Sequence, residues 1–327
     1  MKSAAPVQTT TNLPLPPVFK QSVNSTFLAR FVHESKLRQT RGFNFCYNCS
    51  HIAGWSGFGI VMMKSFSEHH RLWMSLLLAA LFAGCYPSAK IPMGAIHYDA
   101  INVQGPRSLI VFLPGRDDSI SVFKKEGLIE AVRERGLPID MVAVDAHIGY
   151  YMNWSILVRL KEDVIEPLKP KGYSQIWLVG DSLGAYGAIS YAKEHQNEIT
   201  GVVLMGPFLG EKQLLDEIKQ SGGLNKWDPG DIKSSTREAW ERSLWAWFKD
   251  CQTKKGNCPR MYLGYGHGDR FSYAQDYLAS YMSADHVIAI DGNHNWRTWK
   301  KIWHMLLDNN VFQGDKIMPS LSHEVKP

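Results

Sequence analysis

The chain has 327 residues, of which 45% are hydrophobic, and a formal charge of +5 at pH 7. This length and composition are typical of a globular protein with one large domain or two small ones. The positive charge belongs to the N-terminal part, because residues 1–84 hold eight Lys or Arg against two acids and residues 85–327 hold 28 against 29. The larger part therefore has no basic tract that would bind phosphate backbones, and we exclude a nucleic-acid partner.

Residues 1–61 carry little hydrophobic pattern, and we interpret them as an over-extended or disordered leader. Within them, Cys46 and Cys49 have the spacing of half a zinc site or of a redox pair. A structural zinc site needs a second pair of ligands, and no such pair follows nearby in the sequence. The chain also lacks a Gly-rich phosphate loop and a dinucleotide fingerprint. We therefore predict no metal and no cofactor.

Residues 62–84 have the pattern of a secretory signal peptide. A short polar stretch from Met62 is followed by an apolar run of about 13 residues, from Leu72 to Gly84. This run is shorter than the roughly 20 residues that span a bilayer, and it has the length and basic flank of a signal core. The alternative is a buried apolar helix. Because a signal core belongs near the start of translation, Met62 or Met63 is the expected initiator, unless the leader is unusually long.

Small residues stand directly before Cys85, as in Phe82-Ala83-Gly84-Cys85. This stretch resembles the lipobox of bacterial lipoproteins. The resemblance implies that Cys85 is lipidated and becomes the mature N-terminus. Tyr86 rather than Asp follows it, which in that family implies the outer membrane of a Gram-negative cell, with the protein facing the periplasm.

Residues 85–327 alternate between short apolar runs and helical patterns. Such alternation predicts a mostly parallel sheet with helices on both faces, with ligands binding at the carboxyl ends of the strands. The predicted strands are 96–103, 109–113, 141–144, 176–179, 202–205, 261–265 and 286–290, and the predicted helices include 122–135, 154–168 and 296–307.

The strand at 176–179 runs into Gly180-Asp181-Ser182-Leu183-Gly184, and small and apolar residues then continue at helical spacing. A sharp turn between a strand and a helix exposes the apex serine hydroxyl, and glycines two residues on either side allow the close approach. The alternative is an ordinary Gly-rich turn. The stretch resembles the nucleophile elbow of the α/β-hydrolase family, with Ser182 as the nucleophile.

The resemblance implies an acid and then a histidine after Ser182 in the chain. Asp269 ends a Gly-rich stretch after the penultimate strand, and His294 lies in the loop before the last helix. The stretch His294 to Trp299 also resembles the His-x-Trp-x-x-Trp pattern of esterase D-type hydrolases and related acyltransferases. Asp291 is the rival acid, and His147 and His267 are further candidates for contact with a substrate.

A tetrahedral oxyanion needs two backbone N–H donors. The resemblance implies that one comes from Leu183, directly after the nucleophile. It implies that the other comes from the loop after the strand at 109–113, where we assign it to Arg116. Gly115 would let the backbone approach closely, and the alternative is an ordinary strand-exit turn.

The interval of about 50 residues before the strand at 261–265 breaks the alternation, and we expect an insertion at about 209–258. Its apolar residues at helical spacing are Trp240, Leu244, Trp247 and Phe248. They form either the face of a cap over the active site or a helix packed onto the body. In the same segment, Cys251 and Cys258 are an expected disulfide of an exported protein.

The sequence thus predicts an α/β-hydrolase fold and a lipid-anchored serine hydrolase that cleaves carboxylic esters through an acyl-enzyme. The expected substrate is a small-molecule or lipid-like acyl ester. Two alternatives remain: an acyltransferase with the same Ser182, Asp269 and His294, or a non-catalytic binding protein of the envelope on a hydrolase scaffold.

Overall fold

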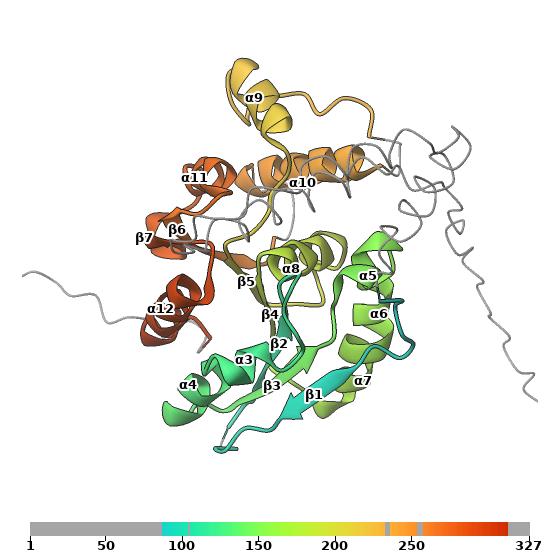
Figure 1. Cartoon of the computed structure of the whole chain (residues 1–327), viewed down its shortest axis with the longest axis vertical. Helices are drawn as coiled ribbons and strands as arrows, with labels where there is room; N and C mark the ends of the chain where they lie inside the picture. Colours follow the sequence, from blue (N-terminus) through green and yellow to red (C-terminus); the bar gives the residue numbers. More distant parts are fainter. Residues whose placement is uncertain (1–86, 104, 233–235, 254–257, 313–327) are drawn as a thin grey trace, which may run out of the picture. The chain divides into compact units, whose positions relative to one another are not determined.

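The computed structural model describes residues 87–103, 105–232, 236–253 and 258–312 (Figure 1). The predicted leader (1–61), the predicted signal peptide (62–84) and Cys85 lie outside the described residues. In the described part, no helix is both long and apolar enough to cross a membrane.

The described residues form a seven-stranded sheet in the order β1-β3-β2-β4-β5-β6-β7. Strand β1 pairs with β3 in the antiparallel direction, and the other neighbours are parallel. Strands β2, β3 and β5 are buried along their whole length, as expected for a parallel sheet covered on both faces. The bounds are β1 (Ala95–Tyr98), β2 (Ser108–Leu113), β3 (Ile139–Val144), β4 (Gln175–Asp181), β5 (Gly201–Met205), β6 (Arg260–Gly268) and β7 (Val287–Asn293).

Helices cover the two faces of the sheet and bury a separate apolar cluster on each. Because side chains alternate along a strand, Leu109 and Val111 of β2 join one cluster, whereas Ile110 and Phe112 join the other. The second cluster lies under α3 (Val122–Lys125), α4 (Leu128–Glu134) and α12 (Trp296–Asp308) (Figure 1). The first lies under α5 (Ile148–Met152), α6 (Ile156–Leu160), α8 (Leu183–Glu194), α9 (Lys212–Gln220), α10 (Arg237–Gln252) and α11 (Ser272–Ala279).

Three predicted elements are divided or shortened in the structure. The helix expected at 122–135 is divided into α3 and α4. Gly127 separates them, because it adopts a left-handed conformation with φ 84° and caps the start of α4. The helix expected at 154–168 begins only after Trp154, itself at φ 60°, and contains a π-helical turn at Lys161–Ile165 before α7 (Glu166–Leu168). The first strand ends at Tyr98 rather than at Val103, which is 65% exposed and pairs with no strand.

Helix α10 lies within the predicted insertion and packs its aromatic face into the body. Trp247 and Phe248 are buried in the first cluster together with Trp245, whose indole N–H donates to the Leu209 carbonyl at 2.8 Å. The indole N–H of Trp240 donates to Oγ of Ser190 in α8 at 3.3 Å. We considered this helix either as a cap over the active site or as a helix packed onto the body, and the packing matches the second interpretation.

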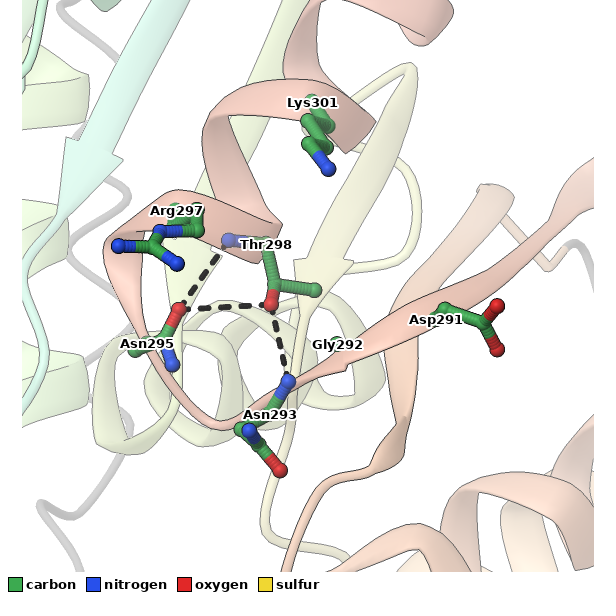
Figure 2. Close-up of a pocket in the computed structure, with 7 residues that line it drawn as sticks. All are labelled: Asp291, Gly292, Asn293, Asn295, Arg297, Thr298 and Lys301. Atoms are coloured by element: carbon green, nitrogen blue, oxygen red, sulfur yellow. Dashed lines mark hydrogen bonds between the residues drawn. The ribbon is translucent and has the colours of Figure 1, made fainter.

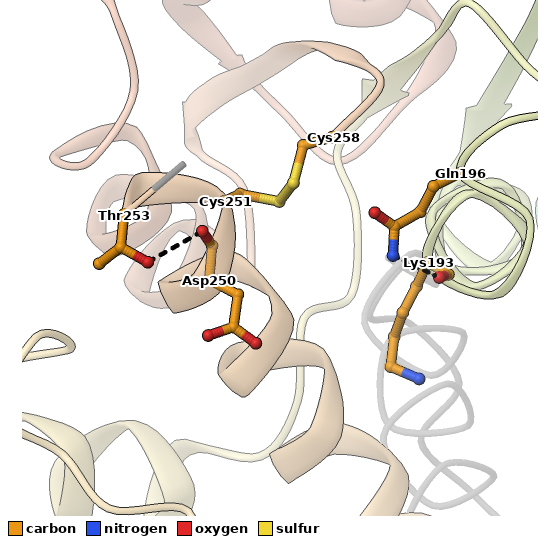
Figure 3. Close-up of a disulfide and its surroundings, with 6 residues drawn as sticks. All are labelled: Lys193, Gln196, Asp250, Cys251, Thr253 and Cys258. Carbon is orange, nitrogen blue, oxygen red and sulfur yellow. Dashed lines mark hydrogen bonds between the residues drawn. A yellow bond between two sulfur atoms is a disulfide. The ribbon is translucent and has the colours of Figure 1, made fainter. Parts of the chain in front are cut away.

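The predicted disulfide is confirmed. Cys251 near the end of α10 bonds to Cys258, which precedes β6, and the two Cα atoms are 5.7 Å apart (Figure 3). The strand order, the single antiparallel strand at one edge and the helices on both faces make this the α/β-hydrolase fold predicted from the sequence.

Candidate active site

Ser182 lies at the sharp turn between β4 and α8, in the conformation that the elbow pattern predicts. Its φ of 49° and ψ of −111° lie outside the regions that non-glycine residues normally occupy. The Ser182 N–H donates to the Met205 carbonyl at the end of β5, at 2.9 Å. Such a conformation persists only where its surroundings enforce it, and here the neighbouring strand fixes the turn.

The two glycines around Ser182 are required by close backbone contacts. A Cβ atom at Gly180 would overlap the backbone of Gly184, and one at Gly184 would overlap the carbonyl groups of Leu113 and Pro114. Gly184 therefore lets the first turn of α8 rest against the end of β2. This contact brings the loop after β2 next to Ser182.

The structure brings Ser182, His294 and Asp269 together from three segments of the chain. Nε2 of His294 lies 2.9 Å from Oγ of Ser182, and Nδ1 lies 2.8 Å from Oδ2 of Asp269. The side chain of Asp269 is fully buried, and that of His294 is 12% exposed. Strands β6 and β7 run three residues further than predicted, so that Asp269 and His294 follow their ends directly.

Both carboxylate oxygens of Asp269 are occupied. Oδ1 accepts the N–H of Phe271 at 2.8 Å, and Oδ2 faces the imidazole. The Phe271 and Trp299 rings meet the His294 ring edge-on, with centroids 5.2 and 5.0 Å away. The imidazole is thus fixed between a carboxylate and two aromatic rings, with its other nitrogen directed at Ser182.

Gly206 also shapes the site, although the sequence did not single it out. It follows β5 with φ 56°, and a Cβ atom there would lie 2.8 Å from Nε1 of Trp299 and 2.9 Å from Oδ2 of Asp269. Only a residue without a side chain leaves room for Asp269 and His294 to meet. The one signal in the sequence is a glycine at the end of a predicted strand.

A group of hydrogen bonds holds the turn after His294. Oδ1 of Asn295 accepts the N–H of Thr298 at 3.2 Å, and Oγ1 of Thr298 accepts the N–H of Asn293 at 3.0 Å (Figure 2). Asn295 thereby caps α12. These bonds join the residues on either side of His294 to the start of the helix.

The rival residues stay outside this arrangement. Asp291 is exposed and lines a surface depression of about 350 Å³, where its carboxylate points away from the other labelled side chains (Figure 2). His147 caps α5 by accepting the N–H of Gly149 at 3.1 Å, and His267 is exposed. The Nδ1 atom of His294 pairs with Asp269 rather than with Asp291.

The two predicted oxyanion donors lie on either side of the contact between β2 and α8. Leu183 is the first residue of α8, where amide N–H groups have no partner within the helix. Arg116 lies in a turn closed by a hydrogen bond from the Asp118 N–H to the Gly115 carbonyl, at 3.2 Å. Within the described residues, no cluster of three or more His, Cys, Asp or Glu has an arrangement that could hold a metal ion.

No protein-family model matches this chain, and no curated protein matches it. Solved structures that it resembles include an S-formylglutathione hydrolase from Staphylococcus aureus (12% identity, 69% of this chain and 98% of that chain, TM-score 0.47). Others are a ferulic acid esterase (14%, 68% and 99%, 0.49) and a monoacylglycerol lipase from Paleococcus ferrophilus (16%, 66% and 99%, 0.41).

Proposed function

We propose that this protein is a serine hydrolase that cleaves carboxylic esters through an acyl-enzyme. The observation that carries the proposal is the pair of contacts at His294, 2.9 Å to Oγ of Ser182 and 2.8 Å to Oδ2 of Asp269. A serine hydroxyl is a weak nucleophile until a base takes its proton, and a buried carboxylate keeps the imidazole in the tautomer that can do so.

In the first half-reaction, Oγ of Ser182 attacks the ester carbonyl carbon while Nε2 of His294 takes the hydroxyl proton. The negative charge on the carbonyl oxygen is stabilised by the amides of Leu183 and Arg116. The tetrahedral intermediate collapses, the bond to the alcohol oxygen breaks, and His294 gives its proton to the departing alcohol. The acyl group is then bound to Ser182.

In the second half-reaction, a water molecule gives a proton to His294 and attacks the acyl-enzyme. The acid leaves, and Ser182 regains its proton from His294. If an acceptor alcohol takes the place of water, the same residues perform acyl transfer. The acceptor therefore distinguishes hydrolase from acyltransferase, and the expected substrate is a small or lipid-like acyl ester.

The test combines covalent labelling with turnover. A fluorophosphonate should add to Ser182 in the wild type and fail to label Ser182→Ala. A panel of acyl esters of graded chain length, assayed with and without added alcohol acceptors, should be turned over by the wild type alone. Full activity in Ser182→Ala would overturn the mechanism, whereas a folded wild type that takes no label would favour the binding protein.

We also propose that the mature protein begins at Cys85, carries lipid there and resides in the cell envelope of a Gram-negative bacterium. The support is the sequence itself: the short apolar run from Leu72 to Gly84 and the small residues before the cysteine. A lipid anchor would hold the hydrolase at a membrane surface, beside lipid-like esters.

A further inference from the structure

Asp181 is a buried carboxyl group that the proposed mechanism does not use. It directly precedes Ser182, and its exposed fraction is 0%. Neither of its carboxyl oxygens accepts a hydrogen bond of normal geometry from the described residues, and the nearby Gly115 amide only partly favours the charged form. Burying an isolated charge in this way is costly, and such a group normally takes up a proton instead.

A second carboxyl group faces Asp181 across Gly115. A Cβ atom at Gly115 would overlap a carboxyl oxygen of Asp181 and lie 3.2 Å from Oδ2 of Asp118. The same Asp118 oxygen accepts the indole N–H of Trp296 at 3.1 Å. In the turn Gly115–Asp118, the first residue therefore packs against Asp181, and the last residue carries the second carboxyl group.

The surroundings favour a proton on Asp181. Burial raises the pKa of Asp181 well above its ordinary value, and the charge of Asp118 raises it further, although the Gly115 amide favours the charged form. Burial also raises the pKa of Asp118, whereas the hydrogen bonds from Trp296 and Asp181 lower it. Two carboxylates cannot bond to each other, but an acid and a carboxylate can.

We propose that Asp181 and Asp118 share one proton at neutral pH, and that this pair holds the turn Gly115–Asp118 against the nucleophile elbow. The inference rests on the proposed function, in which the amide of Arg116, within that turn, stabilises the oxyanion. Asp181 and Asp118 are positioning residues, because neither touches the reacting atoms. Trp296, the first residue of α12 and two residues after His294, connects the pair to that helix through its hydrogen bond to Asp118.

At alkaline pH the shared proton is lost and two like charges face each other in a buried site. The acids and the phenol that also act on the pair do not offset this repulsion. Asp117 and Glu126 are acids that act on Asp118, and Tyr151 of α5 is a buried phenol whose pKa is raised by burial and by Asp181. The turn should then move away from Ser182 and take the amide of Arg116 with it.

The first test is the pH profile of kcat and KM for wild type, Asp181→Asn and Asp118→Asn. In the wild type, kcat should fall by roughly 100-fold at alkaline pH with little change in KM, the loss expected for one oxyanion donor. An amide donates to the remaining carboxylate at every pH, so both variants should lack this fall. Asp117→Asn is the matched control, because that side chain is 87% exposed and lies outside the pair, and it should retain the alkaline fall.

The second test needs no activity. Infrared spectra at pH 8 should show the carbonyl band of a protonated carboxyl group in the wild type and in Ser182→Ala, and the band should vanish in Asp181→Asn. At this pH Glu241, whose pKa burial raises to about 7, is mostly charged and contributes little. An inactive wild type that shows the band would refute the proposed function and leave the pair standing. Absence of the band, or an alkaline fall retained by Asp181→Asn, would overturn the pair.

Discussion

At the scale of single residues, the site depends on conformations and contacts that exclude side chains. Ser182 keeps its strained backbone because its N–H is bound to Met205 and because Gly184 meets the end of β2. Gly206 has no side chain and so leaves room for the close packing of Asp269, His294 and Trp299 around it. Precision at the reacting atoms thus rests on glycines that take no part in the chemistry.

Replacing Gly206 by alanine should lower turnover strongly. The new Cβ atom would displace Asp269 or Trp299, and a misplacement of about 1 Å at a reacting group can cost roughly 100-fold in rate. Gly230→Ala is the matched control, since Gly230 also has a positive φ, 69°, but no neighbour within 4 Å. Thermal melts should show a loss of stability in both variants, larger in Gly206→Ala, and ester kinetics should show a loss of kcat in Gly206→Ala alone. Equal kcat values in the two variants would contradict this.

The assignment of the acid to Asp269 predicts opposite results at two aspartates. Asp269→Asn should fold but lose turnover by roughly 10⁴-fold, because the amide leaves the imidazole in the wrong tautomer. Asp291→Asn should stay close to the wild type, because its carboxylate is exposed and does not pair with His294 (Figure 2). The measurement is kcat/KM on one ester, with circular dichroism as the check on folding. The reverse ranking would move the acid to Asp291.

At the scale of elements, α10 shows how a buried carboxyl group can make the attachment of a helix depend on pH. Glu241 is only 2% exposed, and its Oε2 accepts the N–H of Glu211 at 3.0 Å. Arg237, one turn earlier, lies 3.5 Å from Oε1. Burial nevertheless dominates and raises the pKa of Glu241 to about 7. The helix is therefore attached most firmly when Glu241 is protonated.

This shift in pKa makes stability depend on pH. A carboxyl group with a raised pKa in the folded state stabilises the protein fully below its unfolded pKa of 4.5, and the contribution is lost as pH rises through about 7. The loss amounts to about 3 kcal/mol between pH 4 and pH 8. Urea unfolding of Glu241→Gln should show a correspondingly smaller drop in unfolding free energy over this range. Glu238→Gln, whose side chain is 76% exposed on the same helix, should drop nearly as much as the wild type, because the charge of Glu238 contributes little to the raised pKa of Glu241.

At the scale of the whole molecule, the sequence predicted the features that depend on a local pattern of residues, namely the strands and the nucleophile elbow. Buried runs such as 109–113 and 202–205 located the strands, and the turn around Ser182 located the elbow. The sequence did not predict the features that depend on contacts between segments far apart in the chain. The pairing of Asp118 with Asp181 joins a loop to a strand end 63 positions later in the chain. The role of Gly206 follows from side chains just after β6 and β7 and in α12. Neither contact leaves a periodic signal.

The last prediction concerns the mature protein, and it separates anchoring from catalysis. If Cys85 carries lipid, the wild type should partition into the membrane fraction, and mass spectrometry should find a lipid-modified N-terminal cysteine and no peptide from residues before it. Cys85→Ser should not receive lipid. Its activity toward a soluble ester should match that of the wild type, because Ser182, Asp269 and His294 meet within the described residues. Recovery of residues 1–61 on the protein from cells, or membrane attachment of Cys85→Ser, would contradict the proposed processing while leaving the active site untouched.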